Sequence, residues 1–171
     1  LSPAKIVTDM NNSISDNNES NMFVTLIVGI LDLETGKLKL CNAGHNPPIL
    51  IRPDGQVSFL EFKTQIFVGV IEEFAYTEDE TTLEKGSKLF LYTDGVTEAE
   101  NTEKELYGDE KLLKTLSDNN TSDVRTTVNG IEDSVADHVK EAEASDDLTI
   151  LLIQYEPGQQ TIKHISLWKE K

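Results

Sequence analysis

Three aspartates stand at the ends of apolar segments, where a carboxylate can do chemistry. Asp94 directly follows the apolar run 88–93 and precedes a glycine, which lets the backbone turn sharply. Asp146 and Asp147 directly precede another apolar run, 148–155. If the two runs are neighbouring antiparallel strands, the end of one lies beside the start of the other, and the three carboxylates can meet. Oxygen ligands of this kind suit a hard divalent cation such as Mg²⁺ or Mn²⁺.

The same aspartates also have a plainer interpretation. Asp-Gly is a common turn and Asp-Asp is a common surface pair, so the spacing alone favours solvated surface carboxylates over a metal site. The choice between the two depends on the elements that position these residues and on the motifs around them.

The first half of the chain predicts one helix followed by strands. Ser2 and Pro3 are typical of a helix N-cap and first helical position, and apolar residues then recur at helical spacing. The run 22–31 is apolar and rich in β-branched residues, which predicts a strand buried on both faces. It forms a hairpin with 37–42, and a second hairpin joins 48–52 to 56–61 through a Pro-Asp-Gly turn.

The second half predicts further strands interrupted by helices. We expect 74–83 and 88–93 to form an antiparallel pair around Gly86. Two helices should follow, the longer one carrying an apolar stripe, at 109–116 and from Thr121 onward. The last predicted strands are 148–155 and 161–168. Because strands outnumber helices and do not alternate strictly with them, the pattern predicts an α+β fold with mostly antiparallel sheets.

Composition limits the classes of function. The 171 residues suit one domain, and 31 acidic against 15 basic residues give a formal charge of −16. Such a surface repels nucleic acid, and no basic stripe offsets it, so we expect no nucleic-acid partner. No apolar run is long enough to span a bilayer, so the fragment is expected not to be membrane-inserted and to be cytoplasmic. An acidic chain that acts on a phosphate must bring cations to it.

Two longer motifs decide between the interpretations of the aspartates. The chain reads Asn-Ala-Gly-His-Asn-Pro-Pro at 42–48 and Leu-Tyr-Thr-Asp-Gly-Val-Thr-Glu-Ala at 91–99, and Asp-Asp-Leu-Thr follows at 146–149. This succession resembles the SpoIIE-like and RsbU-like serine phosphatases of the PPM (protein phosphatase 2C) family. The resemblance covers 1–156, and 157–171 is expected to be a C-terminal extension that adds one strand.

The resemblance implies a fold and a metal centre. The implied fold is an α-β-β-α sandwich of two mostly antiparallel sheets flanked by helices, with two Mn²⁺ or Mg²⁺ ions at one end. Asp94 and Asp146 match metal ligands of the family and carry the catalytic assignment. Asp147 is then an alternative ligand or a supporting residue, and Thr93, Gly95 and Thr149 are expected to shape the loop around these carboxylates.

The resemblance is incomplete at the N-terminus. Relatives carry further metal-binding aspartates in a Gly-Asp motif and in a Gly-Asp-x-x-Gly-[His/Lys]-Gly motif, both upstream of the segment that matches Leu1. Neither motif occurs in this chain. We therefore expect an N-terminally truncated phosphatase domain that is inactive by itself.

The same resemblance implies a substrate and leaves rivals open. The expected substrate is phosphoserine on a STAS-type (anti-anti-sigma-like) regulatory protein in bacterial partner-switching signalling. One alternative is a catalytically inactive phosphatase-fold module that binds or regulates, and another is a hydrolase of small phosphate esters. Missing strands would leave a sheet edge uncovered, so a homodimer is also expected. His45 is expected to order its turn by hydrogen bonding and not to take part in catalysis.

Overall fold

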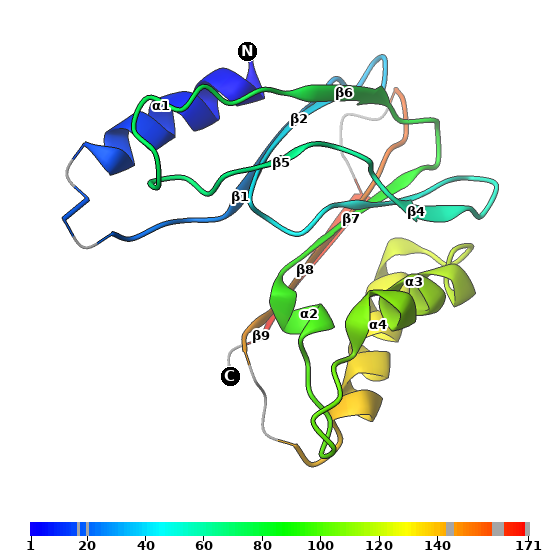
Figure 1. Cartoon of the computed structure of the whole chain (residues 1–171). Helices are drawn as coiled ribbons and strands as arrows, with labels where there is room; N and C mark the ends of the chain where they lie inside the picture. Colours follow the sequence, from blue (N-terminus) through cyan, green and yellow to red (C-terminus); the bar gives the residue numbers. More distant parts are fainter. Residues whose placement is uncertain (17, 20, 143–145, 159–162, 170–171) are drawn as a thin grey trace. The chain divides into compact units, whose positions relative to one another are not determined.

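The computed structural model describes residues 1–16, 18–19, 21–142 and 146–158 and the backbone of 163–169 (Figure 1). The chain divides into two compact units. One comprises Leu1–Pro47 and Glu61–Leu83, and the other comprises Pro48–Leu60 and Glu84–Lys171. In the described part, no helix is long and apolar enough to cross a membrane.

The first unit is a four-stranded sheet with one helix packed against it. Its elements are α1 (Pro3–Ser15), β1 (Leu26–Leu31), β2 (Lys37–Ala43), β5 (Thr64–Gln65) and β6 (Asp79–Thr82). Strand β2 pairs antiparallel with β1 and β6 and parallel with β5. The predicted start of the helix is confirmed, because the Ser2 hydroxyl accepts a hydrogen bond from the Lys5 amide at 3.2 Å. Val7 of α1 packs with Cys41 and Ala43 of β2 in the core.

The prediction of a strand buried on both faces at 22–31 is wrong. Strand β1 begins only at Leu26, its side chains are mostly half-buried, and Met22 is 69% exposed. Within the described chain β1 pairs with β2 alone, so it is an edge strand of its sheet. An apolar run shows that burial is favourable but not which neighbour provides it.

The edge position of β1 leads us to expect self-association of the chain. Unpaired N–H and C=O groups along an edge strand can pair with the same edge of a second copy. Light scattering should therefore give a mass above the 19.1 kDa of one chain, rising with protein concentration. A mass that stays at one chain over a wide concentration range would contradict this expectation.

The second unit is a five-stranded antiparallel sheet with helices against it. Its strands, in spatial order, are β4 (Val57–Phe59), β3 (Ile49–Ile51), β7 (Lys88–Tyr92), β8 (Leu148–Gln154) and β9 (Lys163–Lys169). Its helices are α2 (Asp94–Thr97), α3 (Gly108–Asp118) and α4 (Val124–Val139). The predicted stripe on α4 is confirmed, because Val128 and Ile131 join Phe90 of β7 and Ile150 of β8 in one core. Residues 159–162, which include the start of the strand expected at 161–168, lie outside the described part.

The predicted pairing of 74–83 with 88–93 is also wrong. Strand β6 pairs with β2 in the first unit, whereas β7 lies between β3 and β8 in the second. The turn at Gly86 contacts the segment after β8 instead, because the Gly86 amide donates a hydrogen bond to the Tyr155 carbonyl at 2.8 Å. Sequence proximity favoured a hairpin, but β6 is half-exposed and β7 is almost wholly buried, which suits an outer and a central strand respectively.

A buried lysine fastens the connection between α3 and α4. The Lys88 ammonium donates to the carbonyl of Asn120 at 2.9 Å and to that of Ser122, and the residue is only 5% exposed. Burial lowers the pKa of Lys88, and the nearby Asp123 carboxylate opposes this shift. Asp123 is itself the N-cap of α4, where its side chain accepts from two backbone amides. Lys88 thus holds the start of α4 against the sheet strand that leads to Asp94.

Replacing Lys88 by methionine should destabilise the chain. The two carbonyls lose their buried donor, which costs about 1–3 kcal/mol of unfolding free energy. Urea denaturation followed by circular dichroism measures this change. The exposed Lys85, replaced in the same way, is the matched control and should leave the midpoint unchanged. Equal midpoints for the two variants would show that the Lys88 hydrogen bonds do not stabilise the fold.

Candidate metal centre

Strands β7 and β8 bring the three candidate aspartates to one edge of the sheet. The two strands are antiparallel neighbours in the sheet (Figure 1). Tyr92 lies opposite Ile150 in their register. Asp94 comes two residues after Tyr92, and Asp146 and Asp147 come just before β8 begins. The strand pairing on which the sequence argument depended is therefore confirmed.

Two threonines link the ends of these strands. The Thr93 amide donates to the Thr149 carbonyl at 3.1 Å, and the Thr149 amide donates to Thr93 Oγ1 at 3.1 Å. The Thr93 hydroxyl also lies 3.4 Å from the Asp147 carbonyl oxygen and donates to it. These contacts continue the ladder beyond Tyr92 and fix the segment before Asp94 against the segment after Asp146.

Gly95 allows a very close approach of the two segments. A Cβ atom built at this position would lie 2.2 Å from the Asp147 carbonyl oxygen and 2.9 Å from its carbonyl carbon. Real Cβ atoms do not approach backbone atoms so closely, so only glycine fits without movement of the loop. The glycine of the Asp-Gly pair therefore serves packing against the Asp147 backbone as well as the turn after β7.

The carboxylates themselves are exposed and held close to their own backbones. Asp94 lies in the first turn of α2, and its Oδ1 accepts from the Gly95 amide at 3.0 Å. In the same way, Asp146 Oδ1 accepts from the Asp147 amide at 2.7 Å. All three aspartate side chains face solvent. Each is placed to offer oxygen to a ligand arriving at this edge.

The oxygen atoms of these aspartates are of the kind that a hard cation binds, but the described residues bring too few of them together. Carboxylate and carbonyl oxygens are the ligands that Mg²⁺ and Mn²⁺ prefer. Among the residues that the structure describes, however, no three histidine, cysteine or acidic side chains are gathered closely enough to hold a metal ion. One oxygen of Asp94 and one of Asp146 each accept a hydrogen bond from the following backbone amide, that of Gly95 and that of Asp147. The described residues at this edge thus offer oxygen atoms of the kind that a divalent cation binds, and they do not form a complete two-ion site.

A second sequence motif, 42–48, forms a tight turn after β2. The Asn42 side chain donates to the His45 carbonyl at 2.9 Å and accepts from the His45 amide at 2.8 Å, and Asn42 is 1% exposed. The His45 ring bonds to the Thr25 hydroxyl at 3.2 Å. The turn is ordered by hydrogen bonding, as expected, but the bonds that close it come from Asn42. Sequence reasoning missed this role, although an asparagine at the start of a turn, here three residues before His45, is a recognisable signal.

Replacing Asn42 by alanine should destabilise the fold more than replacing His45. The alanine leaves the amide and carbonyl of His45 without their partner, at a cost of about 2 kcal/mol. His45→Ala keeps both of these bonds and should change the unfolding free energy by less than half as much. Thermal and urea unfolding of the two variants measure their unfolding free energies. A larger loss of unfolding free energy in His45→Ala would show that the imidazole, and not the Asn42 side chain, stabilises the turn.

The comparisons with known proteins place the chain in a family. Residues 1–156 match the model of the family described as Stage II sporulation protein E (SpoIIE). The chain belongs to this family. It is 30% identical over 139 residues to Protein IcfG of Synechocystis sp., covering 81% of the chain and 22% of that protein. It is 24% identical over 155 residues to the phosphoserine phosphatase RsbU of Bacillus subtilis, covering 90% of the chain and 45% of that protein. The chain thus spans less than half the length of these curated relatives.

Solved structures confirm the fold class. The SiaA-PP2C domain of Pseudomonas aeruginosa superposes with a TM-score of 0.79 at 18% identity, covering 91% of this chain and 61% of that one. The chain therefore has an α+β fold of the PP2C type. Other neighbours of this fold include a serine/threonine phosphatase catalytic domain in complex with two manganese ions, at a TM-score of 0.62, and a magnesium complex of RsbX at 0.53.

Proposed function

We propose that the chain is part of a metal-dependent protein serine/threonine phosphatase domain that hydrolyses phosphoserine on a regulatory protein. The observation that carries the proposal is the register of β7 and β8, which brings Asp94 to the same edge as Asp146 and Asp147. Membership of the SpoIIE family and the relative named phosphoserine phosphatase RsbU support it. In this proposal 1–156 is the phosphatase domain and 157–171 is an added extension.

The proposed metal ligands are Asp94 and Asp146, with Asp147 as an alternative ligand. Mn²⁺ or Mg²⁺ bound as a pair in the intact enzyme would supply an activated water for in-line attack on phosphorus. The residues described here do not complete such a pair. The chain's own contribution is positional: the Thr93–Thr149 contacts and the close packing at Gly95 hold the carboxylates at one edge.

The charge of the chain is consistent with a need for cations. A formal charge of −16 repels a phosphoserine, which carries about −1.5 to −2 at neutral pH. Divalent ions at the aspartates would offset both charges. We propose that the domain is cytoplasmic. We also propose that its substrate is a phosphorylated STAS-type regulatory protein in partner-switching signalling, by analogy with the phosphatase family whose motifs the chain resembles.

Phosphate release with Mn²⁺ tests the proposed reaction. We expect the intact enzyme to release phosphate from a phosphoserine STAS-type protein, and we expect the 171-residue chain alone to release little. Turnover of nucleotides or sugar phosphates without turnover of the phosphoprotein would instead support a hydrolase of small phosphate esters. Full activity in the chain alone would refute our account of the missing ligands.

A catalytically inactive binding or regulatory module remains the second candidate. It is favoured by one observation, namely that the described residues do not gather three metal-binding side chains. An intact protein that binds the phosphoserine partner but releases no phosphate at any Mn²⁺ or Mg²⁺ concentration would establish this candidate and refute the enzyme.

A further inference from the structure

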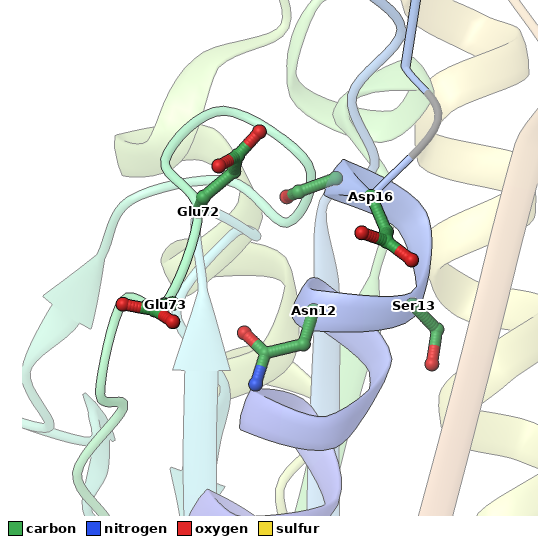
Figure 2. A pocket seen from close by; sticks show the side chains of 6 residues that line it. Asn12, Ser13, Asp16, Glu72 and Glu73 are labelled. Carbon is green, nitrogen blue, oxygen red and sulfur yellow. The ribbon is translucent and has the colours of Figure 1, made fainter.

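The first unit has an acidic hollow at the C-terminal end of α1, and none of the three candidate metal ligands lines it. Its volume is about 400 Å³. The lining residues come from α1 and its end and from the loop before β6, and they are Asn12, Ser13, Ser15, Asp16, Glu72 and Glu73. Figure 2 shows Glu72 and Glu73 on the loop, across from Asn12 and Asp16. Every lining side chain carries an oxygen that can accept a hydrogen bond, and none is basic.

The negative charge of the hollow is not neutralised within the described chain. Asp16, Glu72 and Glu73 have no lysine, arginine or histidine nitrogen within 4.0 Å there, since the ion pairs found involve other carboxylates. The C-terminal end of a helix adds a partial negative charge at the same place. The hollow therefore attracts a cation.

A buried hydroxyl provides a second and independent observation. Ser15 lines the hollow, is 9% exposed, and has a hydroxyl oxygen with no hydrogen-bond partner among the described residues. A buried polar atom without a partner costs free energy, which a donor from a bound group would recover. The hollow thus has an unused hydrogen-bonding position in addition to its charge.

The spacing of the acceptors favours a guanidinium group over a metal ion. A metal needs ligands that converge on one point, and the described residues hold no group of three that does so. A guanidinium instead presents five N–H donors spread over a plane, which can reach separated carboxylate and hydroxyl oxygens together. An ammonium group is more compact and reaches fewer of them.

The loop that carries Glu72 and Glu73 also carries exposed apolar residues. The rings of Phe23 and Phe67 stack with centroids 5.2 Å apart, and they are 59% and 40% exposed. Together with Val70 they line a second hollow of about 300 Å³, and Val70 lies only two residues before Glu72. Exposed aromatic rings beside a charged pocket are typical of surfaces that bind protein segments.

We propose that this surface, formed by the acidic hollow and the Phe23–Phe67 pair, binds a segment of a partner protein that carries an arginine next to an apolar residue. The arginine enters the acidic hollow, and its apolar neighbour covers the aromatic pair. The proposal does not depend on the phosphatase activity, because none of these residues belongs to the candidate metal centre.

Titration with arginine and citrulline tests the polar half of the proposal. N-acetyl-arginine amide added to the 171-residue chain should shift the backbone amide NMR signals of residues 12–16 and 72–73 in a saturable way. N-acetyl-citrulline amide has nearly the same shape without the charge and should shift them at least about tenfold less at equal concentration. Equal shifts from both compounds, or none from either, would overturn the proposal.

Matched variants locate the binding. The neutralised variant Asp16→Asn/Glu72→Gln/Glu73→Gln should bind the arginine amide at least about tenfold more weakly. Its control changes the same charge at exposed positions elsewhere, in Asp54→Asn/Glu84→Gln/Glu141→Gln, and should bind as the unchanged chain does. If the triple variant is unfolded, the single variants Glu72→Gln and Glu73→Gln are used in its place. Equal weakening in the variant and its control would show only an effect of net charge and would overturn the site.

Two dipeptides test the apolar half. N-acetyl-Arg-Leu-amide should bind severalfold more tightly than N-acetyl-Arg-Ser-amide, because only leucine has an apolar side chain for the aromatic pair. In Phe23→Ser this advantage should disappear while the affinity for N-acetyl-arginine amide stays the same. Equal binding of the two dipeptides to the unchanged chain would overturn the apolar half.

Discussion

Replacing Asp94 by asparagine in the intact enzyme should lower phosphate release from a phosphoserine protein at least about a hundredfold. Asparagine keeps the size and the hydrogen bond from the Gly95 amide but removes the negative charge that a divalent cation needs. Since Asp94 is exposed at the sheet edge, the fold should be unaffected. The same change at Asp146 should have an effect of similar size.

The control for this substitution is Asp54→Asn. Asp54 is also exposed, and its carboxylate also accepts from a nearby backbone amide, that of Gln56 at 3.0 Å. It lies in the turn between β3 and β4, and its substitution should leave turnover unchanged. His45→Ala should likewise reduce turnover far less than Asp94→Asn. Near-native turnover of Asp94→Asn at low Mn²⁺ would rule out Asp94 as a ligand.

Replacing Gly95 by alanine should be the most disruptive small change at the site. The added Cβ would meet the Asp147 carbonyl oxygen at 2.2 Å, and this neighbour is backbone and cannot turn aside as a side chain can. The segments around Asp94 and Asp147 must then separate. We expect a loss of about 1–3 kcal/mol in unfolding free energy, as for other overpacked sites, together with a strong loss of phosphatase activity.

Gly29→Ala is the matched control for Gly95→Ala. A Cβ at Gly29 in β1 would lie 3.7 Å from the nearest atom, which is an ordinary contact. This variant should keep both stability and activity, as measured by urea denaturation and phosphate release. If Gly95→Ala also kept both, the close packing of Asp147 against Gly95 would have no functional role.

The elements predicted correctly from the sequence are those specified by local signals. The Ser2 cap and the following proline mark the start of α1, and the four-residue spacing of Val124 and Val128 marks the inner face of α4. The two predicted hairpins, β1 with β2 and β3 with β4, are confirmed by the strand pairing. Each was predictable because its turn residues lie between the two strands. In each case the information lies within a few residues of the element.

The failures concern contacts with parts of the chain that lie far away in sequence. The sequence placed β6 beside β7 because they are consecutive, but β6 completes the sheet of β2. The apolar run that ends in β1 suggested burial on both faces, yet the side chains of this strand are mostly half-buried. Pairing depends on side-chain packing with distant strands, which alternation of apolar residues does not encode.

The candidate site was predictable in position but not in detail. Strand-end reasoning placed Asp94 near Asp146, and the register of β7 and β8 agrees with it. The spacing did not reveal that Asp94 and Asp146 each accept a hydrogen bond from the following amide, which holds each carboxylate near its own backbone. Nor did it reveal the approach of Gly95 to the Asp147 carbonyl, since both depend on the exact path of the two loops.

We propose that Asp94 and Asp146 together hold a divalent cation at one edge of the sheet. Calorimetric titration of the intact protein with Mn²⁺, beside its Asp94→Asn, Asp146→Asn and Asp54→Asn variants, measures whether they do. We expect Mn²⁺ affinity to fall at least about tenfold in the first two variants and to stay unchanged in the third. Unchanged Mn²⁺ affinity in both Asp94→Asn and Asp146→Asn would contradict the assignment of this edge as the metal centre.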